Sequence, residues 1–167
     1  MFETILDLPD EAATAALGAA LGRTRARGDV IALVGPLGAG KTALARAYIA
    51  EATGTADAPS PTFGLVHRYD APDGPIHHFD LYRLERPGDV WELGLEDALE
   101  DGVCLIEWPE RIADWLPPST LLVELTISGA GRRARLRGAA SWRDRLAAIA
   151  DTPGQIAVNA KASPSDE

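Results

Sequence analysis

The residues best suited to do chemistry lie together in the segment Gly35–Thr42, which reads GPLGAGKT. This segment matches the phosphate-binding pattern G-x-x-x-x-G-K-[ST] at every fixed position. In that pattern, glycines let backbone N–H groups approach the phosphates, the lysine reaches the β- and γ-phosphates, and the hydroxyl holds Mg²⁺. Lys41 is therefore a candidate catalytic residue and Thr42 a candidate metal ligand. The expected nucleotide contacts are Gly35, Gly38, Ala39, Gly40, Lys41, Thr42 and Ala43.

Two elements must position this loop. The apolar run 29–34 predicts a buried strand before it, and residues 42–52 predict a helix after it, with Gly54 as a stop signal. The N-terminus of such a helix adds a partial positive charge to the site. A chance glycine-rich turn is the alternative, but the flanking strand and helix favour a phosphate-binding loop.

A nucleotide hydrolase also needs an acidic residue near Mg²⁺, and two strand ends supply candidates. The apolar strand 103–106 is followed by Glu107, whereas the more polar strand that begins at residue 76 reaches Asp80. We favour Glu107 as the main catalytic and metal-binding carboxylate, and Asp80 as a second one that acts through water. A turn or capping carboxylate is the alternative for Asp80.

The histidines before Asp80 are expected to be ordinary strand residues. His77 and His78 point to opposite faces of a strand, so they cannot hold one metal ion together. His78 shares a face with Asp80 and could form a hydrogen bond to it.

A loop threonine follows the predicted helix. Thr62, in Ser60-Pro61-Thr62, lies twenty residues after Thr42, a spacing at which a switch threonine can sense the γ-phosphate. On spacing alone, a plain residue at the start of a strand is an equally good interpretation.

Composition limits the remaining possibilities. The chain has 167 residues, 46% of them hydrophobic, and a formal net charge of −9, which disfavours unaided binding to nucleic acid. No apolar run approaches the length that spans a bilayer, and the acidic N-terminus does not resemble a signal peptide. The single cysteine, Cys104, suits a reducing cytoplasm and is expected to be an inert core residue.

The other elements complete an α/β domain. We expect a strand at 2–8, taken as an edge strand, a helix from about 10 to 27, a hairpin of strands 62–69 and 76–82, and a helix at 88–99 broken near Gly94. A short helix at 111–116, a second hairpin over 121–137 and a helix at 141–150 follow. Two hairpins added to a parallel core predict a P-loop NTPase-like three-layer fold with a mixed parallel and antiparallel sheet. Residues 1–150 form the domain, and 151–167 form a polar, flexible tail.

Several stretches together resemble the TsaE family, the bacterial ATPase component of tRNA threonylcarbamoyladenosine synthesis. The resemblance covers about residues 1–140. Its most specific parts are HFDLYRL at 78–84 and IEWPE at 106–110, which follow the phosphate-binding loop in this order. The other matching stretches are LPDEAAT at 8–14, SPTF at 60–63 and ELGL at 92–95.

The resemblance implies a weak ATPase that uses ATP and Mg²⁺ and is stimulated by partners. Those partners would be a TsaD-like transferase and a TsaB-like protein, in a complex that modifies adenosine 37 of tRNA. The chain would then meet tRNA only through the complex, with no membrane contact. In the family, phosphates and Mg²⁺ are held by residues that match Lys41, Thr42, Thr62, Asp80 and Glu107. Trp108 matches a family tryptophan at the nucleotide site or partner contact, and Glu11, Thr14 and Arg132 are weaker candidates near the base.

Two other functions remain in view. A small-molecule P-loop kinase would need an arginine-bearing lid, which the arginines of 132–137 could imitate, although a hairpin strand fits them better. A switch or binding module with negligible turnover is the other possibility. Trp91, Leu93 and Leu95 are apolar residues among charges, so part of this segment either faces a partner or packs in the core.

Overall fold

The computed structural model describes residues 1–55, 64–150 and 157–158. Within these ranges the strands are β1 (Phe2–Leu8), β2 (Val30–Val34), β3 (Val66–Ala71), β4 (Gly74–Asp80), β5 (Val103–Glu107), β6 (Leu121–Ser128), β7 (Gly131–Gly138) and β8 (Ala157–Val158). The α-helices are α1 (Glu11–Arg23), α2 (Lys41–Thr53), α3 (Leu95–Asp101) and α4 (Arg143–Ala150). Short 3-10 helices are η1 (Pro87–Trp91), η2 (Pro109–Trp115) and η3 (Ala140–Trp142).

The strands form one mixed sheet, in the order β3-β4-β5-β2-β6-β7-β1-β8. β4, β5, β2 and β6 run parallel to one another, while β3 and β7 join as antiparallel hairpin partners of β4 and β6. The predicted mixed sheet with two hairpins is therefore confirmed. Because β2, β4 and β5 are parallel, their carboxyl ends meet at one edge of the sheet, and this edge carries the site.

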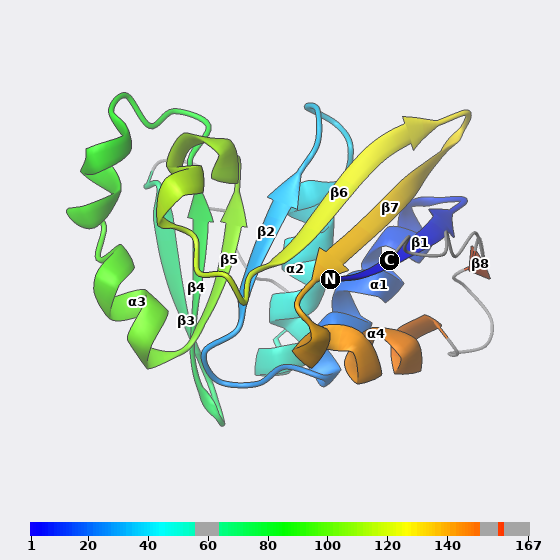
Figure 1. Ribbon diagram of the computed structural model, residues 1–167, viewed down its shortest axis with the longest axis horizontal. Coiled ribbons are helices and arrows are strands. Elements are labelled where there is room, and N and C mark those ends of the chain that lie inside the picture. The colour runs from blue at the N-terminus through cyan, green and yellow to red at the C-terminus, as the bar shows by residue number, and fades with distance from the viewer. Residues whose placement is uncertain (56–63, 151–156, 159–167) are drawn as a thin grey trace.

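Helical layers cover the two faces of the sheet, as the three-layer prediction requires (Figure 1). One hydrophobic cluster packs α1, α2 and α4 against residues such as Ile31, Leu33 and Leu105. A second cluster packs η1, α3 and η2 against the other side of the same strands, at Val30, Phe79 and Ile106. The central strands are covered on both faces, which explains why β2 is apolar throughout and β5 is apolar up to its last residue, Glu107.

Two glycines let α1 and α2 pack closely. A Cβ atom at Gly18 would overlap the carbonyl oxygen of Leu44, and a Cβ atom at Gly22 would lie 2.9 Å from the carbonyl oxygen of Tyr48. Real Cβ atoms essentially never come so close to a backbone oxygen. Any larger residue would push the two helices apart.

The structure corrects two expectations, the end of α1 and the place of β1 in the sheet. α1 ends at Arg23 rather than near residue 27, because the N–H of Thr24 closes the last turn and the Arg25 side chain donates back to the Gly22 carbonyl. β1 is also not the outermost strand, since β8 pairs with Leu6 and Asp7. The rest of the predicted tail lies outside the described residues, so its flexibility stays a prediction.

Other expectations hold. The helix expected at 88–99 is divided into η1 and α3 by Gly94, whose φ of 84° lies in the left-handed region. Cys104 is fully buried, and burial raises the pKa of its thiol to about 12. In the described parts of the chain, no helix is both long and apolar enough to cross a membrane.

Candidate nucleotide site

The phosphate-binding loop connects β2 to α2 at the carboxyl edge of the sheet. Gly35, Gly38 and Gly40 all have positive φ angles, of 150°, 79° and 104°. Gly40, in this left-handed conformation, is the N-cap residue of α2. No described side chain caps the helix there by accepting a hydrogen bond from its first N–H groups. The free donors and the helix dipole favour an anion at this point.

Lys41 is held inside the loop. Its side chain is almost fully buried, and its ammonium donates to the Gly35 carbonyl and lies 3.4 Å from the centroid of the Trp108 ring. Burial lowers the pKa of the ammonium, while the carboxylates of Glu107, Glu110 and Asp80 oppose that shift. The cation is therefore placed beside acidic groups in a site of low solvent exposure.

Glu107 is the buried carboxylate at the centre of the site. Its Oε1 accepts a hydrogen bond from the Thr42 hydroxyl at 2.8 Å, and its Oε2 lies 2.7 Å from Nε2 of the fully buried His78. Each carboxylate oxygen thus has its own partner, which fixes the orientation of the group. This geometry joins the end of β5 to the first turn of α2.

Asp80 lies beside Glu107, because the two residues are register partners in neighbouring parallel strands. Asp80 is partly buried and accepts a hydrogen bond from the Tyr82 N–H at 3.2 Å. Burial raises the pKa of its carboxyl group, the Tyr82 bond opposes the shift, and the charge of Glu107 adds to it. The bond from Tyr82, two residues later in the chain, is typical of a turn carboxylate, so the alternative interpretation of Asp80 also holds in part.

A cavity of about 250 Å³ contains these groups. Its lining includes the loop, Asp80, Glu107 and Trp108. Carboxylate and hydroxyl oxygens are the ligand type that Mg²⁺ prefers, usually together with substrate phosphates and water. Thr42, Glu107 and Asp80 thus fit a magnesium ion, and the loop donors fit phosphate.

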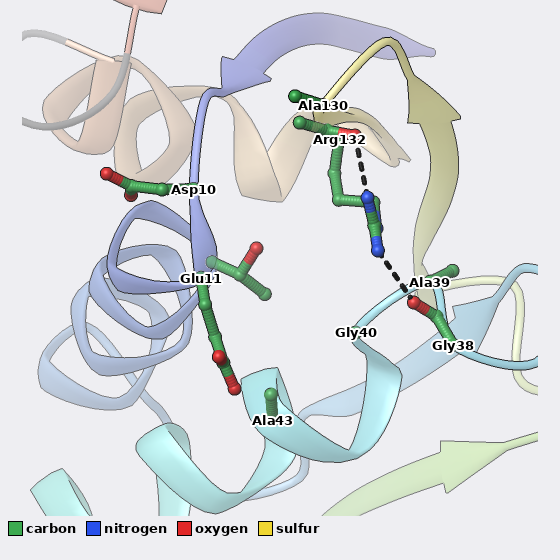
Figure 2. A pocket seen from close by; sticks show the side chains of 10 residues that line it. Asp10, Glu11, Gly38, Ala39, Gly40, Ala43, Ala130 and Arg132 are labelled. Atoms are coloured by element: carbon green, nitrogen blue, oxygen red, sulfur yellow. Dashed lines mark hydrogen bonds between the residues drawn. The ribbon is translucent and has the colours of Figure 1, made fainter.

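A second cavity of about 260 Å³ lies on the other side of the loop, between the start of α1 and the β6–β7 hairpin. Figure 2 shows Arg132 extending from the hairpin toward the loop, where its guanidinium donates to the Gly38 carbonyl at 3.1 Å, and Glu11 extending from α1 toward Ala43. Thr14 also lines this cavity, as do Gly38, Ala39, Gly40 and Ala43, which border both cavities. The two spaces therefore adjoin along the loop.

Every predicted site residue that the structure describes lines one or the other of these cavities, except Gly35, whose carbonyl accepts a hydrogen bond from Lys41. Thr62 lies outside the described residues, so its role stays a prediction. The hydrogen bond predicted between His78 and Asp80 is wrong, because Nε2 of His78 pairs with Glu107 instead. His78 and Glu107 are not register partners in β4 and β5. Their contact depends on how the side chains reach between the strands, so no spacing along the sequence predicts it.

The remaining arginines of β7 do not reach this site. Arg133 pairs with Asp7 at 3.0 Å, and Arg135 pairs with Glu3 at 3.8 Å, both across to β1. Arg133 and Arg135 form a solvated strand face, as their alternating spacing predicts, whereas Arg137, which the same spacing places on that face, is half-buried.

A parallel strand, a G-x-x-x-x-G-K-T loop with a helix behind it, and carboxylates at the adjacent strand ends define a P-loop nucleotide-binding domain. Comparison with protein families gives a more specific assignment. The family model described as "Threonylcarbamoyl adenosine biosynthesis protein TsaE" matches residues 8–135, more than half of the chain. The chain belongs to the TsaE family.

Individual relatives agree with this assignment. A tRNA threonylcarbamoyladenosine biosynthesis protein TsaE from Rickettsia felis is 38% identical over 130 residues, which cover 77% of this chain and 76% of that protein. The protein of the same name from a Nostoc species is 40% identical over 135 residues, covering 78% and 82%. The crystal structure of YdiB from Bacillus subtilis superposes with a TM-score of 0.72 over 89% of this chain and 94% of that one. Its sequence identity is 24%, so it shows the fold alone.

Proposed function

We propose that this chain binds and hydrolyses Mg-ATP as the ATPase component of the complex that adds threonylcarbamoyl to adenosine 37 of tRNAs. Family membership supports the pathway. The observation that supports the chemistry is the buried Glu107 carboxylate, fixed by the Thr42 hydroxyl and His78 next to the phosphate-binding loop. These two partners hold the carboxylate beside the loop hydroxyl, where a divalent cation bound to nucleotide phosphates needs an acidic oxygen ligand.

The residues then have separate tasks. Lys41 and the N–H groups of the loop hold the phosphates, and Thr42 and Glu107 hold Mg²⁺, with Asp80 acting through water. Bound Mg-ATP would supply the phosphoryl group that water attacks. Mg²⁺ and the Lys41 ammonium would offset the negative charge that develops on that group. Trp108 covers one side of the Lys41 ammonium and limits its exposure to solvent. Thr62 is proposed as the switch residue that senses the γ-phosphate.

The base is proposed to occupy the second cavity, between Glu11, Thr14 and Arg132. Replacing Arg132 by alanine should weaken binding of a fluorescent ATP analogue by about three- to tenfold, the loss of one hydrogen bond and a nearby cation. The matched control is Arg133→Ala, whose guanidinium pairs with Asp7 away from the cavity. Equal affinities of the two variants would argue against this placement of the base.

Partners complete the proposal. We infer that a TsaD-like transferase and a TsaB-like protein carry the transfer chemistry and hold the tRNA, since a net charge of −9 disfavours direct binding to tRNA phosphates. A cytoplasmic location fits this role, and the buried thiol of Cys104 fits a reducing compartment.

A reconstituted modification assay tests the proposal. Multi-turnover threonylcarbamoyl transfer by the two partner proteins should require this chain and ATP, and hydrolysis by the chain should rise when the partners and tRNA are added. A variant with Lys41→Met should reduce transfer to the level seen without the chain. The proposal fails if adding the chain changes nothing, or if the chain alone binds tRNA tightly at physiological salt.

A small-molecule kinase is the weaker alternative. The arginines that could imitate its lid lie in strand β7, and two of them pair with β1 carboxylates. Phosphorylation of one member of a panel of acceptor substrates would favour it. ATP hydrolysis that stays negligible with the partners present would favour a binding module instead.

A further inference from the structure

Two tryptophans form an exposed aromatic pair on the face of the molecule built by η1 and η2. The side chains of Trp91 and Trp115 keep 42% and 37% of their surface exposed, and their ring centroids lie 5.1 Å apart. Of the three apolar residues singled out in this segment, Leu95 is buried in the core, whereas Trp91 is exposed, so a partner contact stays a prediction for Trp91. Large aromatic side chains that stay exposed together are typical of protein-binding surfaces.

This pair stands on a rigid base. Val90 of η1 and Ile112 of η2 are buried in the second hydrophobic cluster, directly beneath the segments that carry the tryptophans. The backbone segments that carry the rings are therefore anchored to the core, which lowers the cost of ordering this surface when a partner binds.

The surroundings of the pair are acidic. From Pro87 to Trp115 the sequence contains nine carboxylate residues and one cationic residue, Arg111; of the nine, Glu107 is buried in the nucleotide site and Asp101 pairs with Arg27. Glu92 and Asp114, next in sequence to the two tryptophans, are exposed, and neither forms an ion pair with any described residue. The Arg111 guanidinium is directed to the backbone carbonyls of Tyr82 and Leu84.

We propose that the Trp91–Trp115 pair and its acidic rim dock a protein partner through a basic surface, with a cationic side chain of the partner seated on the indole rings. Carboxylates attract such a surface over several ångströms, and indole faces bind guanidinium and ammonium groups. The inference rests on the proposed function for the identity of the partner complex. It adds which face of this chain meets that complex.

The Trp91–Trp115 surface is connected to the nucleotide site through η2, which agrees with a role in docking a partner. η2 begins immediately after Trp108, whose ring covers Lys41 and lies 4.9 Å from the Tyr82 ring, and η2 ends at Trp115. A partner on this surface would therefore contact the segment that continues from the nucleotide site. RNA is a poor occupant, because nearby carboxylates repel its phosphates.

Binding of the full chain to the purified TsaD-like and TsaB-like proteins, followed by biolayer interferometry, tests the proposal. We expect Trp91→Ala with Trp115→Ala to weaken binding at least tenfold. Glu92→Lys with Asp114→Lys should weaken it similarly and reduce its dependence on salt. The controls are Ile127→Ala, an exposed apolar residue of β6, and Asp70→Lys, an exposed carboxylate of β3. Both controls should bind like the wild type.

Mg-ATP affinity and thermal unfolding of each variant, measured on the chain alone, should match the wild type. Such a match would show that weaker binding to the partners does not come from a folding defect. Wild-type binding kept by both double variants would overturn this proposal and leave the proposed function intact. A wild-type chain that does not bind the partners would overturn both. Loss of direct tRNA binding in the variants, with protein binding unchanged, would identify RNA as the occupant and overturn the proposal.

Discussion

Replacing Lys41 by methionine should lower the affinity for Mg-ATP by about a hundredfold and abolish measurable hydrolysis. Methionine keeps an unbranched apolar side chain but removes the ammonium that is positioned for the phosphates. A hydrogen bond between charged groups contributes up to about 3 kcal/mol, which corresponds to this loss. Isothermal titration calorimetry with ATP and a phosphate-release assay measure the two effects.

The matched control is Arg46→Met, which removes an exposed cation from the same helix. It should leave affinity and hydrolysis unchanged. Thermal unfolding of Lys41→Met without nucleotide should stay close to that of the wild type, since burial already disfavours the charged form of Lys41. Unaltered ATP affinity in a folded Lys41→Met variant would refute the assignment of the loop as the phosphate site.

Replacing Glu107 by glutamine should raise the Mg²⁺ concentration needed for half-maximal hydrolysis by more than about tenfold, and lower the maximal rate further. The amide keeps the shape of the carboxylate and can still accept from the Thr42 hydroxyl, but it lacks the charge that holds a divalent cation. Hydrolysis measured over a magnesium titration reports both effects.

Comparison with Asp80→Asn shows which of the two carboxylates matters more for magnesium binding. Asp80→Asn should shift the magnesium dependence less than Glu107→Gln does, because Asp80 is less buried and has no bond to Thr42 among the described contacts. A normal magnesium dependence in Glu107→Gln together with a large shift in Asp80→Asn would reverse the assignment.

The phosphate-binding loop and the main carboxylate could be predicted because their signals are local. The loop pattern is continuous in sequence, and Glu107 ends the more apolar of the two candidate strands, so its position at the carboxyl edge follows from the parallel sheet. The partner of His78 could not be predicted in this way. His78 and Glu107 belong to different strands, and which of two nearby carboxylates a histidine reaches depends on side-chain packing.

The late hairpin shows the same limit. Alternation predicted a solvated face that Arg133, Arg135 and Arg137 share, which holds for the first two, whereas Arg137 is half-buried. Alternation did not predict that Arg132 reaches across to the phosphate-binding loop. That contact depends on how far the twisted β6–β7 hairpin extends over the loop. The end of α1 was placed too late because the helical pattern continues past Arg23, whereas the Thr24 and Arg25 contacts end it there.

The close glycine contact between α1 and α2 has a consequence for how the molecule can change shape. α1 begins at one wall of the second cavity and α2 begins at the phosphate-binding loop, and Gly18 and Gly22 lock these helices together. The cavity proposed for the base and the loop therefore belong to one stiff body that is assembled when the chain folds. The conformational entropy lost in ordering this body is therefore not lost again each time a nucleotide binds. A signal of nucleotide state would then leave by groups outside this body, namely the proposed switch residue Thr62 and the segment that runs from Trp108, beside Lys41, into η2.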